Sequence, residues 1–256
     1  FTYFATGLFK KIVIADNLTP FLQSIDTFRP DTSGPLYLVN SLFSAFKVYY
    51  DASGYCDMAI GISALLGIKL SENFNNPFFA KSISDYWRRW HITISRFFRD
   101  YVYISLGGNK VSQVRFVFNI VTTFLLSGLW HGASWNFVVW GLCHGILISL
   151  ENTVLKPFRI KSEHFLVELL RWVRTLYIIL SVRCFYTSHS FSDGMFYLKK
   201  YNMAIWDTLT GNISDYPLML PNTSYYFTLI ILALLFSFEF VAFLVRKTTI
   251  SNFMSN

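Results

Sequence analysis

The chain has 256 residues, of which 53% are hydrophobic, 19% are aromatic and only 14% are charged, and its formal net charge is +7. Soluble domains carry about 25% charged residues, so this composition excludes an ordinary soluble domain and indicates a polytopic α-helical protein with membrane lipid as a partner. The excess of Lys and Arg fits short cytoplasmic loops, and we expect no nucleic-acid partner.

The first 70 residues predict helices separated by polar breaks. Residues 1–14 resemble the end of a membrane span, and residues 16–35 predict a loop rich in Pro, Thr and Asp. A polar stretch at 51–57 interrupts the apolar run that follows. It predicts either a broken membrane helix that lines a cavity or a short surface loop. In the first case Ser53 and Asp57 are candidate substrate-binding residues.

Residues 85–103 predict one charged helix, which is too polar to span lipid and should lie at the interface or re-enter the membrane. Ser82 or Ser84 is expected to cap its first turn. Asp85 faces Arg88 and Arg89 at the i+3 and i+4 positions, a spacing that favours ion pairs.

Residues 116–150 contain no Asp, Glu, Lys or Arg. A bilayer span needs roughly 20 apolar residues, so this segment predicts two helices that meet at a break. Gly128 and Gly132 mark the break and flank His131. A titratable group at membrane depth is a functional candidate by default.

The remaining third predicts a helix at 165–186, a long polar connection at 187–221 and a membrane span at 225–245. Cys56, Cys143 and Cys184 are isolated, which predicts free thiols. Because no His, Cys or carboxylate pair has ligand spacing within one element, we expect no metal site.

The histidines carry the best candidates for chemistry. His131 is expected to act as a general base, because neutral imidazole suits that role near neutral pH. His91 is either a second active-site imidazole or an ordinary member of the charged helix. His144 is expected to pack or form a hydrogen bond. Trp130 and Asn136, which neighbour His131 in the chain, are candidate substrate-binding residues.

Arg88 and Arg89 leave two possibilities open. They either hold an anionic donor through charge-assisted hydrogen bonds or set the topology of the chain through the positive-inside rule.

Two long motifs resemble the membrane-bound O-acyltransferase (MBOAT) family, in particular its bacterial alginate O-acetylation branch. They are SDYWRRWHITISRFFRDYVYISLGGNK and LSGLWHGASWNFVVWGLCHG, and the preceding DASGYCDMAIGISALLGIKLSENFNNPFFAK is similar to the same branch. The resemblance implies an all-α, polytopic transmembrane helical bundle with broken or re-entrant helices around a central histidine. It implies that His131 is catalytic and that His91 is the second functional histidine.

The resemblance also implies an activity. An acetyl group would pass from a cytoplasmic thioester, acetyl-CoA or another acyl thioester, across the membrane for O-acetylation of an extracellular polysaccharide, with no bound cofactor. A periplasmic or extracellular acetyltransferase would be the protein partner, and the location would be the inner (plasma) membrane with several spans. Residues 1–256 would form one membrane-embedded domain, the C-terminal portion of a longer protein whose first helices are absent.

Other functions remain open. D-alanyl or other acyl transfer to teichoic acid or lipid would use the same histidines. A proton-coupled transporter could use His131 as a proton relay, although transporters are often built from repeats and none is evident. A scaffold without catalysis is a further possibility.

Overall fold

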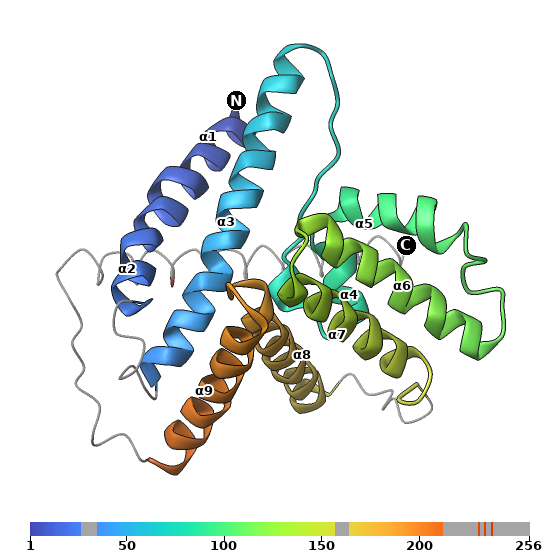
Figure 1. Cartoon of the computed structure of the whole chain (residues 1–256). Coiled ribbons are helices and arrows are strands. Elements are labelled where there is room, and N and C mark those ends of the chain that lie inside the picture. The colour runs from blue at the N-terminus through green and yellow to red at the C-terminus, as the bar shows by residue number, and fades with distance from the viewer. Residues whose placement is uncertain (27–34, 157–163, 212–229, 231–232, 234–236, 238–256) are drawn as a thin grey trace. The chain divides into compact units, whose positions relative to one another are not determined.

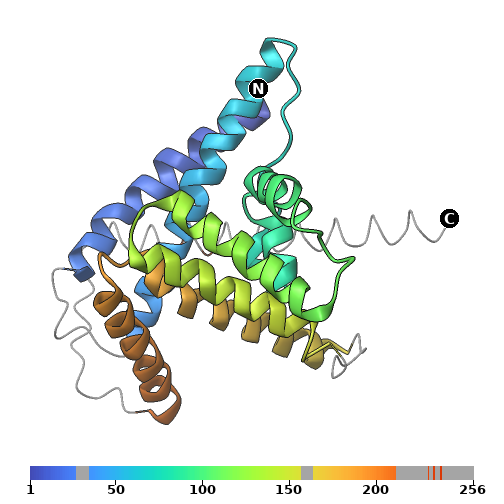
Figure 2. The same cartoon turned by 45° about the vertical axis from the view of Figure 1, so that its right-hand side comes forward.

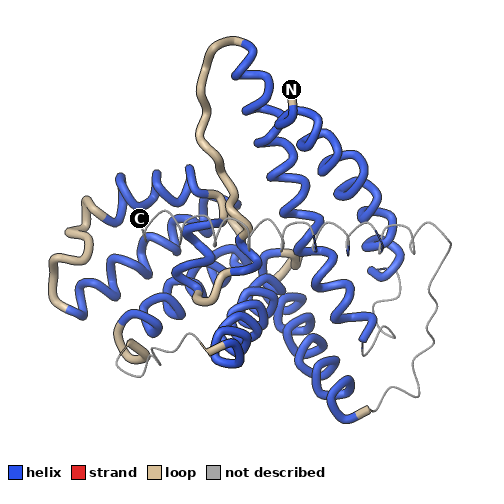
Figure 3. The backbone as a smooth tube through the Cα atoms, turned by 180° about the vertical axis from the view of Figure 1, so that it is seen from behind, coloured by secondary structure: helices blue, strands red, loops and turns tan. Residues whose placement is uncertain are grey.

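The computed structural model describes residues 1–26, 35–156 and 164–211, together with residues 230, 233 and 237. Within these ranges the chain forms helices and connecting loops and contains no strand (Figure 3), which confirms the predicted all-α class. The chain divides into two compact units, one including residues 1–26 and 43–72 and the other including residues 73–156 and 164–211. The predicted span at 225–245 lies outside the described residues, apart from those three positions.

The first unit begins with a helical run that contains α1 (Thr2–Leu8), a π-helical segment (Phe9–Ala15) and α2 (Asp16–Asp26). Beside this run lies α3 (Pro35–Leu65), of which residues 43–65 belong to the first unit (Figure 1). The loop predicted for 16–35 is therefore wrong up to residue 26. Ile14, Leu18 and Phe21 recur at helical spacing and are almost completely buried. The Phe21 ring lies 5.3 Å from the Phe43 ring, so apolar burial outweighs the polar composition of this segment.

Helix α3 continues through residues 51–57, so the predicted interruption is wrong. Lys10 Nζ lies 2.8 Å from Asp57 Oδ2, and Lys11 Nζ lies 2.8 Å from Asp51 Oδ1. At Gly54 an added Cβ would lie 2.8 Å from a backbone oxygen of α1. The acidic residues are thus neutralised by the neighbouring helix, which removes the need for a break in α3.

The second unit opens with a short 3₁₀ turn and the charged segment, which the sequence predicts as one helix. The structure breaks it at Trp90 and His91. Ser82 Oγ accepts a hydrogen bond from the Asp85 amide at 3.0 Å, which confirms the predicted cap, and Arg89 Nε lies 3.0 Å from Asp85 Oδ1. The pieces are the turn Pro77–Phe79, α4 (Ile83–Arg89), α5 (Ile92–Phe98) and a π-helical segment (Arg99–Tyr103).

The uncharged segment forms α6 (Gln113–His131) and α7 (Trp135–Asn152), which run antiparallel beside each other (Figure 2). The prediction of two helices that meet at a break is confirmed. Gly128, however, lies inside α6 and not in the break. An added Cβ there would lie 2.3 Å from the Phe137 carbonyl oxygen, and one at Gly141 would lie 2.3 Å from the Phe124 carbonyl oxygen. Glycines therefore bring the two helix backbones into direct contact, as in many membrane helix pairs.

In the described part of the chain, α6 alone has the length and apolar composition to cross a bilayer. A helix of 19 residues reaches about 28 Å, close to the thickness of the hydrocarbon core. The predicted multi-pass topology and single-domain organisation stay predictions.

Two further helices complete the second unit, α8 (Phe165–Tyr186) and α9 (Phe191–Thr210). The predicted helix at 165–186 is confirmed. The prediction of a polar connection at 187–221 is wrong for residues 191–210, which form α9. Ser190 Oγ caps α9 by accepting from the Asp193 amide at 3.1 Å, and Tyr201 and Ala204 are buried on one side. All three cysteines are free, as predicted.

Candidate active site

His131 is the last residue of α6 and is half-buried among aromatic rings. Its ring centroid lies 4.8 Å from that of Trp130, 5.1 Å from that of Trp140 and 5.2 Å from that of Tyr186, each in an edge-on arrangement. These rings come from α6, α7 and α8. The end of one helix therefore places the imidazole where three helices meet.

His91 occupies the break between α4 and α5 in a left-handed backbone conformation, with φ 44° and ψ 56°. This conformation costs a residue other than glycine roughly 1–2 kcal/mol. Strain of this kind persists only where the surroundings enforce it, and it gathers at functional sites. The His91 ring lies 5.8 Å from the Phe74 ring.

Trp130 connects the two histidines. Its ring centroid lies 6.3 Å from that of His91 and 4.8 Å from that of His131, edge-on in both cases. The structure thus brings together two imidazoles that are 40 residues apart in the chain, each at a helix break and each against the same indole. Trp130 is 54% exposed, which leaves part of its surface open to a ligand.

His144 has the packing role that the sequence predicts. It is buried on α7, and its Nδ1 accepts a hydrogen bond from Trp87 Nε1 at 3.2 Å. The Trp87 ring also lies 5.7 Å from the Trp140 ring, which contacts His131. This chain of contacts fixes α4 on α7 beside the candidate site.

Asn136 is also buried, and protein groups occupy its amide. Asn136 Nδ2 donates to the Ser188 carbonyl at 2.8 Å, and Oδ1 accepts from the Ser134 hydroxyl. These bonds tie the start of α7 to the segment after α8. A substrate-binding role for Asn136 stays a prediction.

Ser53 and Asp57 belong to the first unit and are described within it. Ser53 is 2% exposed, and its hydroxyl has no hydrogen-bond partner among the described residues. Asp57 pairs with Lys10. A role for either residue in binding a substrate also stays a prediction.

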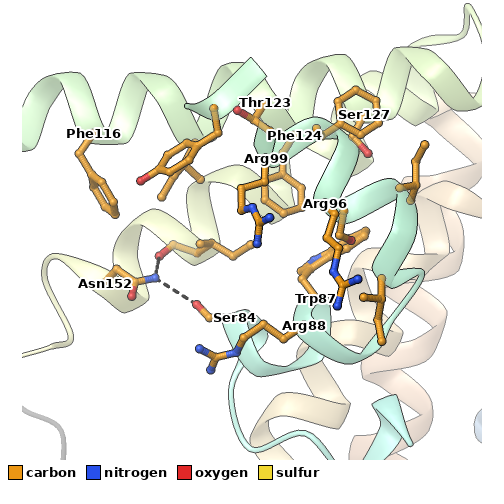
Figure 4. A pocket seen from close by; sticks show the side chains of 17 residues that line it. Ser84, Trp87, Arg88, Arg96, Arg99, Phe116, Thr123, Phe124, Ser127 and Asn152 are labelled. Atoms are coloured by element: carbon orange, nitrogen blue, oxygen red, sulfur yellow. Dashed lines mark hydrogen bonds between the residues drawn. The ribbon is translucent and has the colours of Figure 1, made fainter. Parts of the chain in front are cut away.

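A cavity of about 630 Å³ lies in the second unit between the α4–α5 segment and the α6–α7 pair. Figure 4 shows the side chains of Arg88, Arg96 and Arg99 reaching into this space. Its lining also includes Trp87 and Ser127, each four residues before one of the two histidines. Apolar side chains form much of the remaining wall, among them Phe116, Ile120, Phe124 and Ile148.

The arginines around this cavity differ in their pairing. Arg99 Nε lies 2.7 Å from Asp100 Oδ1, and this contact lowers the pKa of the Asp100 carboxyl. Arg88 and Arg96 are exposed and form no ion pair within the described ranges. Arg89 pairs with Asp85 and does not line the cavity. The arrangement suits a ligand with an anionic head and an apolar or amphipathic tail.

Sequence reasoning missed Arg96, Arg99 and the cavity. On one continuous helix, the Cα atoms of Arg88 and Arg96 would lie about 12 Å apart along the axis. The bend at His91 turns α5 relative to α4 and brings these positions to the same space. No local pattern in the sequence predicts that bend.

Comparison with known proteins identifies the family. Residues 4–191 match the model of MBOAT, the membrane-bound O-acyltransferase family. The chain belongs to the MBOAT family. The resemblance inferred from the motifs is thereby confirmed.

Several MBOAT relatives are similar over most of the chain. Identity is 42% over 200 residues with a peptidoglycan O-acetyltransferase of Helicobacter pylori, covering 77% of this chain and 37% of that protein. It is 40% over 179 residues with a probable alginate O-acetylase of Azotobacter vinelandii, covering 70% and 35% respectively. A teichoic acid D-alanyltransferase of Bacillus subtilis is 38% identical over 112 residues, covering 41% of this chain and 28% of that protein. The alignments thus cover little more than a third of the first two MBOAT relatives.

Proposed function

We propose that this protein is a membrane-bound O-acyltransferase that moves an acetyl group from a thioester donor toward the hydroxyl groups of a glycan outside the cytoplasm. One observation carries the proposal. In a chain of this family, His91 and His131 lie at separate helix breaks and contact the same indole, that of Trp130. One imidazole in such a pair can take the proton from a reacting hydroxyl, while the second can donate a hydrogen bond to a reacting carbonyl.

His131 acts as the general base in this reaction. It takes the proton from the acceptor hydroxyl while the hydroxyl oxygen attacks the thioester carbonyl carbon. The carbon–sulfur bond then breaks, and the departing thiolate takes the proton back from the imidazolium. The ester forms, the free thiol leaves, and His131 returns to its neutral state.

The donor binds in the cavity beside α4 and α5. Acetyl-CoA, or another acyl thioester on a phosphate-bearing carrier, has the anionic head and extended tail that this cavity favours. Arg88 and Arg96 hold the phosphates, because guanidinium groups bind phosphate oxygens in two-pronged geometry. Arg89, which is paired with Asp85, fits the topological role better than the donor-binding role. The protein lies in the inner (plasma) membrane with several spans, and its donor arrives from the cytoplasm.

The acceptor belongs to the class of hydroxyl-bearing glycans. Two relatives that are similar over 70% or more of this chain are named for peptidoglycan and alginate, which are both carbohydrate polymers. A separate acetyltransferase outside the cytoplasm is the partner that completes the transfer. The similarity to teichoic acid D-alanyltransferase covers a shorter part of the chain and makes D-alanyl transfer the second candidate.

The test compares cells that lack the protein with the same cells complemented by it. Ester-linked acetyl groups are released with mild base and quantified separately in peptidoglycan and in secreted polysaccharide, and D-alanyl esters are quantified in teichoic acid. We expect complementation to restore acetyl esters in one of the two glycan fractions. Restoration of D-alanyl esters alone would replace the proposal with the second candidate, and unchanged esters in all fractions would refute acyl transfer.

Arg96 provides a test of the donor site. Arg96→Gln is expected to raise the KM for acetyl-CoA by about tenfold, because a charge-assisted hydrogen bond contributes about 1.5–3 kcal/mol. The KM for an acetyl thioester of N-acetylcysteamine, which has no phosphate, should stay within about twofold of wild type. Initial rates in membrane vesicles would measure both constants.

Arg115→Gln is the matched control for this experiment. Arg115 is exposed on α6 and lies 5.0 Å over the Phe118 ring, outside the cavity lining. The control should leave the KM for acetyl-CoA unchanged. An equal rise in KM for both thioesters in Arg96→Gln would argue against phosphate recognition by this arginine.

A further inference from the structure

The bend that carries His91 is in contact with a buried asparagine, Asn73, which precedes the 3₁₀ turn. Asn73 is 8% exposed. Its backbone carbonyl accepts from the Ile92 amide at 2.8 Å. Its side-chain Oδ1 accepts from the Thr93 amide at 3.0 Å and from Thr93 Oγ1 at 2.9 Å. The asparagine therefore fastens the start of α5 directly after His91.

These bonds fix the orientation of the Asn73 side chain. The two ends of an asparagine amide look alike in shape, and their assignment depends on the hydrogen-bond partners. A backbone N–H can only donate, so the atom that faces the Thr93 amide has to be the oxygen. The other end of the amide, Nδ2, therefore faces His91.

This orientation determines where His91 carries its proton. Asn73 Nδ2 lies 3.1 Å from His91 Nδ1. An amide NH₂ group has no acceptor capacity, so Nδ1 has to offer its lone pair and cannot bear a hydrogen. In a neutral imidazole the single hydrogen then resides on Nε2, because the partner of one ring nitrogen sets the role of the other.

We propose that Asn73 is a positioning residue that holds His91 as the neutral Nε2–H tautomer, so that His91 serves the reaction as a hydrogen-bond donor. The assignment of the tautomer stands on its own geometry, whereas the role as donor rests on the proposed acyl transfer. Donation from Nε2 to the thioester carbonyl oxygen stabilises the negative charge that develops there during attack. His91 keeps its proton throughout, and His131 alone exchanges protons with the acceptor and the thiol.

The protonated form of His91 is disfavoured by the same contact. An imidazolium would place a second N–H against the amide hydrogens of Asn73, and an NH₂ group cannot accept a hydrogen bond. Burial also lowers the pKa of the His91 imidazole, which acts in the same direction. The two histidines thus have different tasks, although their residue type is the same.

Nitrogen NMR of the protein in lipid tests the tautomer without any measurement of activity. The chain contains five histidines, so ¹⁵N-labelled histidine gives five imidazoles, and the signal that disappears in His91→Gln assigns His91. We expect the wild-type signal at neutral pH to show Nε2 protonated and Nδ1 unprotonated. A signal for Nδ1–H or for imidazolium would overturn the proposal even if acyl transfer is demonstrated.

Asn73→Asp tests whether Asn73 causes this state. One carboxylate oxygen can still accept from Thr93, while the other now offers an acceptor to His91 Nδ1. We expect a hydrogen to appear on Nδ1 in this variant, and no change in Asn109→Asp, which places the same charge at an exposed residue. An unchanged His91 signal in Asn73→Asp would refute the positioning role.

Two substitutions of His91 test its role as donor. His91→Gln retains an N–H near the position of Nε2 but has no basic nitrogen, whereas His91→Ala has neither. We expect kcat in the Gln variant to exceed that in the Ala variant by about tenfold, with similar KM values. Equal kcat values for the two variants would refute the donor role. The NMR result is independent of this test: an Nε2–H tautomer would stand even if the protein transfers no acyl group.

Discussion

His131→Ala should lower the rate of acyl transfer by about 10²- to 10⁴-fold, the usual contribution of general acid–base catalysis. Among the described residues, His131 is not part of the cavity lining, so the KM for the donor should change little. The measurement is the initial rate of labelled acetyl transfer in membrane vesicles at saturating donor, with the amount of protein in the membrane determined in the same vesicles.

The matched control is His189→Ala, which removes an exposed histidine in the loop before α9. Its rate should equal that of wild type. If His131→Ala retained a rate within about threefold of wild type, the assignment of His131 as the base would be wrong, and the reaction would need another group to accept the hydroxyl proton.

Gly128→Ala should strongly destabilise the pair formed by α6 and α7. The added Cβ would lie 2.3 Å from the Phe137 carbonyl oxygen and 3.1 Å from its carbonyl carbon, so one of the helix backbones has to move. Overpacking of this kind costs about 1–3 kcal/mol. In a protein of this size that loss lowers the midpoint of thermal unfolding by about 2–12 °C, which can be measured for the purified protein in detergent.

Gly132→Ala is the matched control, since it adds the same methyl group four residues further on. There the Cβ would lie 2.9 Å from the edge of the Phe137 ring, and a side chain can turn aside where a backbone cannot. The unfolding midpoint of Gly132→Ala should lie clearly above that of Gly128→Ala. Equal midpoints for the two variants would show that backbone contact does not control the stability of the pair.

The fold was predictable where composition alone decides it. A run of 35 uncharged residues, which is too long for one span, identifies α6 and α7, and of the two glycines Gly132 alone lies in their break. The predictions of loops and breaks are wrong where tertiary contacts outweigh local composition. α2 and α9 are rich in polar residues, yet buried residues such as Leu18 and Tyr201 hold them as helices. The acidic residues Asp51 and Asp57 suggested a break in α3 because their partners lie 40 or more residues away, in the first helical run.

The candidate site was predictable in its residues and not in its geometry. Long motifs marked His91, Trp130 and His131, but spacing within one segment cannot reveal that a tryptophan from α6 lies against both imidazoles. Asn73 carried no signal of its own, because asparagine in a polar turn is common. Its role follows only from its hydrogen bonds to Thr93 and His91.

The direct contact between α6 and α7 has a consequence for the order of folding. The two helices are joined by three residues, and contacts between segments so close in the chain form quickly, since little chain has to be ordered to close them. The end of α6, with His131 and Trp130, can thus acquire its shape as soon as α7 is synthesised. Tyr186 follows more than 30 residues later. A newly made chain therefore assembles one half of the site from neighbouring sequence and has to wait for α8 to complete the other half.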